Sequence, residues 1–156
     1  MKKILIGTSI FFTITTLVLA YILLFTGTEL VKNEKDTRIT VKYAPDLRDL
    51  VLSEMRDYLE VIAEIQQGIA EDNPDKIYKA ASRQGQVSIE DTPVRLLKLS
   101  PIPCKTMGFA GHHLFQAIAD SAKTNYNPKT TIKQLSALTN NCISCHRTYK
   151  IDMTEK

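Results

Sequence analysis

The chain has 156 residues, which is a length for one domain beside any targeting segment, and its formal charge of +3 gives no argument for nucleic-acid binding. Three cysteines exclude a disulfide framework, and the absence of tryptophan with only 6 glycines favours a helical protein over a turn-rich β protein. No nucleophile–base constellation or phosphate-binding loop is visible, so the sequence does not predict an enzyme.

The first segment predicts a membrane anchor. After a basic start at residues 1–3, residues 4–25 form a run of 22 without a formal charge. About 20 apolar residues can cross a bilayer as a helix, whereas a cleaved secretory signal has a shorter apolar region and a small-residue cleavage site. We therefore predict an uncleaved transmembrane signal-anchor, with a cleaved peptide as the alternative. Lys2 and Lys3 would keep the N-terminus cytoplasmic, so the remaining chain would face the periplasm, or its Gram-positive equivalent, from the cytoplasmic (inner) membrane.

Residues 26–44 read as a charged linker. Within them Ile39, Val41 and Tyr43 alternate with polar residues, which is typical of a short extended piece, but no partner strand is evident nearby. The folded domain is predicted to span residues 45–150, followed by a tail at 151–156.

Two amphipathic helices are expected at the start of this domain. Pro45 suits the first turn of a helix, and the apolar residues that follow recur in steps of four and three, as in helix bundles. These residues are Val51, Met55, Tyr58, Ile62, Ile65 and Ile69. Pro74 stops this helix, Asn73 can cap the next one, and Gly85 weakens the end of the second helix.

The second half predicts an irregular crossing and two further helices. Three prolines argue against one long helix through residues 87–103. A third helix is expected over about 106–123 and a fourth from about Pro128. The fourth helix again has a seam in steps of three and four, formed by Leu135, Leu138, Cys142, Cys145 and Tyr149. Four helices with short first and third connections predict an all-α fold, an antiparallel four-helix bundle.

The fourth helix carries the most specific pattern of the chain, Cys142-Ile-Ser-Cys145-His146. The spacing C-x-x-C-H is typical of covalent c-type haem attachment, in which two thiols form thioethers and the histidine binds iron. In a helix the three side chains share one broad face. The alternatives are a thioredoxin-like redox pair, which calls for a preceding strand, and a zinc half-site, for which only His112 and His113 remain as further histidines.

In these residues and their spacing, the sequence resembles the class II c-type cytochromes, the cytochrome c′-like four-helix bundles. That family carries C-x-x-C-H near the end of the last helix, followed by an aromatic and a basic residue, as Tyr149 and Lys150 are here. The stretch 107–115 is also similar to the segment before the haem helix in small relatives. The resemblance implies one covalent haem c, redox partner proteins and, because relatives often pair through their first two helices, a homodimer as one arrangement. The transmembrane start departs from the soluble members.

The sixth iron ligand decides the function that the resemblance implies. Cytochromes c′ close this face with an apolar side chain of the first helix, whereas low-spin relatives place a methionine there. Met55 lies at about that position, and the sequence leaves open whether it binds iron or only packs in the core. Iron ligation would make the protein a membrane-anchored mono-haem electron carrier. Core packing alone would leave a five-coordinate haem that binds nitric oxide or carbon monoxide.

Several neighbouring residues have open roles. Only one of His112 and His113 can face the core, where a polar network is favoured over iron ligation. Cys104 is predicted to be a semi-buried free thiol. Arg147 and Lys150 either meet haem propionates or stay solvated at the helix end. A third hypothesis for the whole chain is a helical envelope protein whose cysteine pair is a thiol–disulfide site without haem.

Overall fold

The computed structural model describes residues 2–25, 36–86 and 92–153. Within these ranges the chain forms six helices and two five-residue strands, so the predicted all-α class is confirmed in its coarse form. The chain divides into two compact units, residues 1–36 and 37–156, and each is described by itself.

The first unit consists of α1 (Lys2–Phe25), the helix of the predicted anchor. Three threonine hydroxyls in it donate hydrogen bonds to backbone carbonyls four residues earlier, which satisfies these polar groups within the helix. The described part of α1 exposes large apolar side chains, namely Ile10, Phe11, Phe12, Ile14, Leu17, Val18 and Leu19. Among the described residues, no helix combines the length and the hydropathy that a membrane crossing requires.

The second unit begins with a strand that the sequence only partly revealed. β1 (Ile39–Tyr43) pairs in parallel with β2 (Tyr149–Met153), with Ile39 opposite Tyr149 and Tyr43 opposite Met153. The expected extended piece is therefore present, but the expectation that it lacks a partner is wrong, because the partner follows the last helix. Thus the unit starts near residue 37 instead of 45, and residues 151–153 of the predicted tail belong to the sheet. Residues 26–35 of the predicted linker lie outside the described ranges.

Four long helices build the body of this unit: α2 (Pro45–Ala70), α3 (Pro74–Gly85), α5 (Ile102–Thr124) and α6 (Pro128–Thr148). Each has a proline in its first turn, where the missing N–H costs nothing. The side chains of Asn73 and Asn127 accept hydrogen bonds from backbone N–H groups in the first turns of α3 and α6, at 3.0 and 3.1 Å. The helices at Pro45, Pro74 and Pro128 begin where the sequence predicted.

The predicted crossing is more regular than expected. A short helix, α4 (Val94–Leu99), lies within it, and α5 already begins at Ile102 although its start was expected near residue 106. The prolines explain this division, because Pro93 and Pro101 each directly precede a helix and occupy its N-cap position. Residues 87–91 of the crossing lie outside the described ranges.

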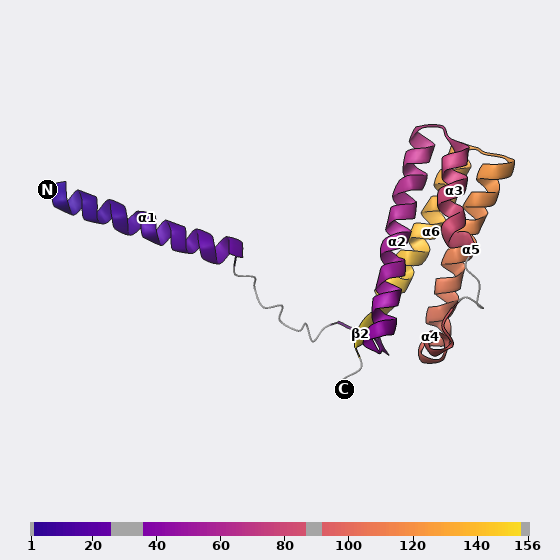
Figure 1. Ribbon diagram of the computed structural model, residues 1–156, viewed down its shortest axis with the longest axis horizontal. Coiled ribbons are helices and arrows are strands. Elements are labelled where there is room, and N and C mark those ends of the chain that lie inside the picture. The colour runs from indigo at the N-terminus through magenta and orange to yellow at the C-terminus, as the bar shows by residue number, and fades with distance from the viewer. Residues whose placement is uncertain (1, 26–35, 87–91, 154–156) are drawn as a thin grey trace. The chain divides into compact units, whose positions relative to one another are not determined.

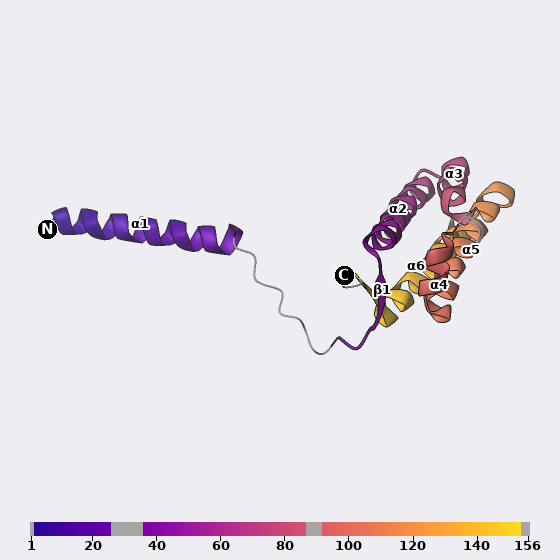
Figure 2. The same cartoon turned by 60° about the horizontal axis from the view of Figure 1, so that its bottom comes forward.

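The helices share one main core. α3 packs against α2 and α5, and α5 packs against α6, so that the four helices lie side by side (Figures 1 and 2). The largest fully buried side chains come from all four helices and are Phe115, Ile65, Ile77, Ile118, Leu138, Val61 and Thr131. Burial of each large aliphatic or aromatic side chain contributes about 1.5–3 kcal/mol, so this cluster holds the helices together.

A second, smaller core lies where the strands meet the helices. Its buried members are Val41, Tyr43, Leu47, Leu96 and Tyr149, and partly buried side chains packed against it include Val51, Cys104, Met107, Cys145 and Ile151. Tyr149 thus serves packing, as its seam position indicated. Direct contacts between α2 and α6 are sparse.

Candidate functional site

The C-x-x-C-H motif occupies the last two turns of α6, the helix in which it was predicted. Cys142 and Cys145 are half-buried, whereas His146 is exposed. Cys145 packs against the second core, and the backbone carbonyl of His146 accepts a hydrogen bond from Arg38 Nη1 at 3.4 Å. The three motif residues share a helical face, and that face extends from the domain interior to its margin.

Two adjoining cavities lie beside the motif. The first, of about 140 Å³, is lined mainly by α2, α4 and α5, and the second, of about 320 Å³, mainly by β1, α2, α6 and β2. Five residues line both cavities, namely Tyr43, Val51, Met55, Cys104 and Cys145. His146 lines only the second cavity, and Cys142 lines neither. The structure therefore brings two of the three motif residues to the cavities, with Cys142 one turn behind them.

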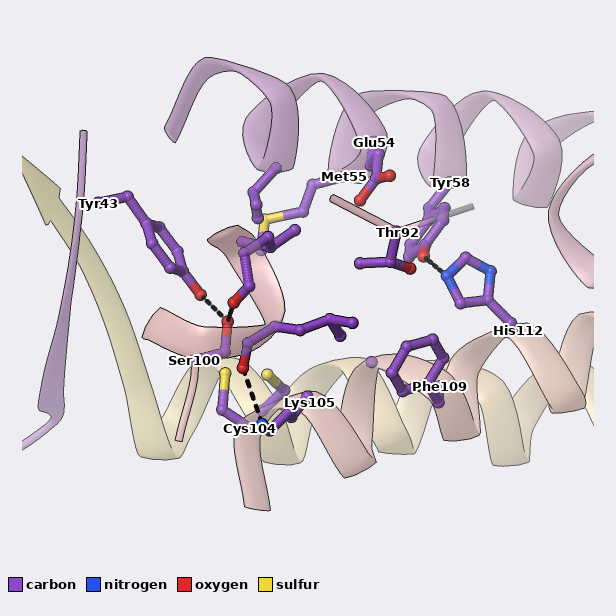
Figure 3. A pocket seen from close by; sticks show the side chains of 15 residues that line it. Tyr43, Glu54, Met55, Tyr58, Thr92, Ser100, Cys104, Lys105, Phe109 and His112 are labelled. Atoms are coloured by element: carbon purple, nitrogen blue, oxygen red, sulfur yellow. Dashed lines mark hydrogen bonds between the residues drawn. The ribbon is translucent and has the colours of Figure 1, made fainter. Parts of the chain in front are cut away.

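Met55 of α2 lines both cavities as well. Figure 3 shows its side chain extending from α2 toward the helices across the cavity, beside Glu54. Met55 and His146 both line the second cavity, so the two candidate axial ligands border one space from two different helices. A thioether and an imidazole facing one apolar space are the donor set that a c-type haem uses.

The lining of the second cavity fits a haem in its chemistry. Val41, Leu52 and Ile151 supply apolar walls for the porphyrin ring. Arg38 and Lys150 add two positive charges at the same cavity, which suits the anionic propionates. Lys150 was a predicted candidate for this role, Arg38 was not, and Arg147 is exposed and lines neither cavity.

Cys104 is the unexpected neighbour of the motif. It lies in the first turn of α5, half-buried as predicted, and together with Cys145 it packs against the second core and lines both cavities. The neighbouring Cys145 thiol lowers the pKa of Cys104 to about 7, and Cys104 in turn raises the pKa of Cys145 above its usual range. The helix ends act in the same direction, because a first turn favours an anion and a last turn disfavours one. Burial raises the pKa of Cys142.

A polar network closes the far end of the first cavity. His112 is 8% exposed, and its Nε2 and Nδ1 lie 2.9 Å from the Tyr58 hydroxyl and 2.7 Å from the Gln84 carbonyl oxygen. Because the carbonyl only accepts, Nδ1 carries the proton and donates, and in the neutral ring Nε2 accepts from Tyr58. His113 is exposed, so the expectation that one of the pair faces inward, in a polar network, is confirmed.

Two titratable groups beside this network are shifted by burial. Burial raises the pKa of Tyr58, which keeps its hydroxyl protonated as a donor. Burial also raises the pKa of the Glu54 carboxyl, which lines the same cavity. The sequence indicated Tyr58 only as an apolar seam position, and its spacing gave no sign of the hydroxyl's partner.

A second hydrogen-bond chain fixes α4 at the cavity mouth. The Tyr43 and Ser100 hydroxyl oxygens are 2.7 Å apart, and Ser100 donates to the Leu96 carbonyl at 2.7 Å (Figure 3). Lys105 Nζ donates to the Leu97 carbonyl at 2.8 Å. Sequence reasoning missed these residues, because their partners lie in the segment expected to be irregular.

Comparison with known proteins gives no match to this chain. No protein-family model matches the chain, and neither the curated proteins nor the solved structures give a match. Across the described residues, no group of three or more His, Cys, Asp or Glu side chains is placed to hold a metal ion. The C-x-x-C-H motif and the cavities beside it are therefore the features that bear on function.

Proposed function

We propose that the protein is a membrane-anchored mono-haem c-type cytochrome that transfers single electrons on the outer face of a bacterial cytoplasmic membrane. The observation that carries this proposal is that Met55 of α2 and His146 of α6 line one cavity, with Cys145 beside them. Methionine opposite histidine holds iron six-coordinate and raises its reduction potential, which suits electron transfer between redox partner proteins.

Each residue has a defined task in this proposal. Cys142 and Cys145 would hold the haem by thioether bonds, His146 and Met55 would be its axial ligands, and Arg38 with Lys150 would offset the propionate charges. Bound haem supplies the one-electron chemistry of iron. The protein supplies apolar walls that exclude water from the ring, and no residue is assigned to transform a substrate.

We also propose the finer architecture, an antiparallel four-helix bundle of α2, α3, α5 and α6. The support is that α2 and α3, and likewise α5 and α6, are joined by connections of three residues, 71–73 and 125–127, which suit antiparallel neighbours. A homodimer through the first two helices of the bundle, as in the resembling family, would use α2 and α3.

The signal-anchor remains part of the proposal. Exposed apolar side chains on the described part of α1, such as Phe11, Phe12 and Leu17, support contact of this helix with lipid. Residues 1–3 would then lie in the cytoplasm and the haem domain in the periplasm. Removal of the segment as a cleaved signal peptide is the alternative, and N-terminal sequencing of the membrane-extracted protein distinguishes the two.

The alternative function is binding of nitric oxide or carbon monoxide by a five-coordinate haem. One observation favours it: Met55 also lines the first cavity, whose volume of about 140 Å³ provides space for a diatomic gas. The donors of the Tyr58–His112 network lie at that cavity as well. In this case Met55 would only pack in the core.

The visible spectrum of the full chain, expressed with a haem-attachment system, tests the proposal. We expect a six-coordinate low-spin spectrum with a sulfur-to-iron band that disappears in Met55→Leu and persists in Met107→Leu, the matched control from the second core. A high-spin spectrum that changes with carbon monoxide would favour gas binding. Absence of haem bands would refute both and leave the thiol–disulfide hypothesis.

A further inference from the structure

Two cysteines from different helices meet beside the haem motif. Cys104 of α5 and Cys145 of α6 pack against the same core and line the same two cavities, and their two helices pack against each other. A disulfide joins cysteines whose Cβ atoms lie about 3.5–4.5 Å apart, and two cysteines on packed helices that line the same two cavities are placed to approach each other. Because Cys145 is also a haem attachment point in the proposed function, this contact concerns haem attachment directly.

We propose that Cys104 and Cys145 form a disulfide in the haem-free protein, and that this bond withdraws Cys145 from haem attachment. The inference rests on the proposed function. It assigns Cys104 a role that the haem motif does not include: a redox gate that must be opened by a dithiol reductant before the second thioether can form.

The oxidation is a balanced thiol–disulfide exchange. One thiolate of the pair attacks a small-molecule disulfide such as oxidised glutathione, which forms a mixed disulfide and releases one glutathione thiolate. The second protein thiolate then attacks the protein sulfur of the mixed disulfide and releases the other glutathione. Overall the two protein thiols lose two electrons and two protons, and the oxidant's disulfide becomes two thiols.

The helix geometry favours this pair over the two cysteines of the motif. Cys142 and Cys145 are three residues apart on α6, where Cβ atoms of such neighbours lie about 5–6 Å apart. A disulfide needs a Cβ–Cβ distance of about 3.5–4.5 Å, so bonding the motif pair would distort the helix. Cys104 approaches Cys145 from a neighbouring helix, and its own helix position is free of that constraint.

Peptide mapping of the haem-free full chain tests the proposal. The chain is expressed without a haem-attachment system, kept in mild detergent, treated with oxidised glutathione, alkylated with iodoacetamide and digested without reduction. We expect a Cys104–Cys145 cross-linked peptide pair with Cys142 alkylated. Cys142→Ser should keep the link, and Cys104→Ser should abolish it. A Cys142–Cys145 bond, mixed disulfides alone or a dimer linked through Cys104 would overturn the proposal.

Haem yield tests the gate and separates it from the proposed function. In a host that lacks the periplasmic reductants serving haem attachment, we expect less haem per protein in the wild-type chain and recovery in Cys104→Ser or Cys104→Ala. Equal loss in these variants would assign the block to the motif pair and overturn the gate. If no haem attaches in a fully competent host while the Cys104–Cys145 link still forms, the cytochrome function fails and the disulfide stands without its role as a gate.

Discussion

Met55 of α2 and His146 of α6 line one cavity of about 320 Å³, and Met55 and Cys145 also line the adjoining cavity of about 140 Å³. No local sequence pattern predicts that these residues are close, because α2 is the first helix of the second unit and α6 is its last. The shared position of Met55 and His146 at one cavity has consequences that can be measured.

Replacement of Met55 by leucine should lower the reduction potential of the haem-loaded protein. A thioether ligand stabilises reduced iron, so its loss favours the oxidised state, by an amount within the roughly 0.8 V range that axial ligands span. Leucine keeps nearly the same volume, so packing should cost less than about 1.5 kcal/mol. Spectroelectrochemical titration measures the potential, and an unchanged potential with an unchanged spectrum would show that Met55 only packs.

The cysteines of the haem-free protein should differ in the pH at which they react. Iodoacetamide reacts with thiolates, and the neighbouring Cys145 thiol lowers the pKa of Cys104 to about 7, whereas burial raises the pKa of Cys142. The alkylation rate of Cys104 should therefore reach half its maximum near pH 7, and that of Cys142 above the usual thiol range. Mass spectrometry of reduced protein at a series of pH values follows each site.

Cys145→Ser is the informative variant for this reactivity. A serine hydroxyl can still donate to the Cys104 sulfur, so the low pH midpoint should largely persist, whereas Cys145→Ala removes the donor and should move the midpoint upward. If neither substitution changes the pH midpoint of Cys104 alkylation, the neighbouring Cys145 side chain does not determine the pKa of Cys104.

Whether a feature could be predicted from the sequence depends on how far apart along the chain the interacting residues are. The starts of α2, α3 and α6 were predictable because proline and asparagine act within one helical turn. The β1–β2 pairing was not, because a parallel partner lies far along the chain and leaves no local signal. The Cys104–Cys145 contact depends on how α5 and α6 are rotated against each other, which periodicity alone does not determine.

Tyr58→Phe should destabilise the domain by about 1–3 kcal/mol. The substitution keeps the ring in the core but removes the hydroxyl that donates to His112 Nε2 at 2.9 Å, which leaves a buried acceptor without its partner. Tyr78→Phe is the matched control, because that ring is also partly buried against the main core and keeps its position under Lys123 Nζ. Urea unfolding followed by circular dichroism compares them, and equal effects would argue against the Tyr58–His112 bond.

Two helical glycines should respond to alanine with opposite signs. A Cβ at Gly85 would lie 2.7 Å from backbone atoms of Gln116, so α3 and α5 would have to separate, at a cost of about 1–3 kcal/mol. The separation would also stretch the neighbouring hydrogen bond from His112 to the Gln84 carbonyl. A Cβ at Gly108 meets nothing within 4 Å, so alanine there should stabilise α5 by up to about 1 kcal/mol through its helix propensity.

Urea midpoints of Gly85→Ala and Gly108→Ala, measured in the same haem state, should therefore lie on either side of the wild-type value. A rise of both midpoints would show that helix propensity outweighs the contact at Gln116, and a fall of both would contradict the prediction for Gly108. A fall for Gly85→Ala beside a rise for Gly108→Ala would support a close approach of α3 to α5 at Gly85, next to the Gln84 carbonyl that accepts the hydrogen bond from His112.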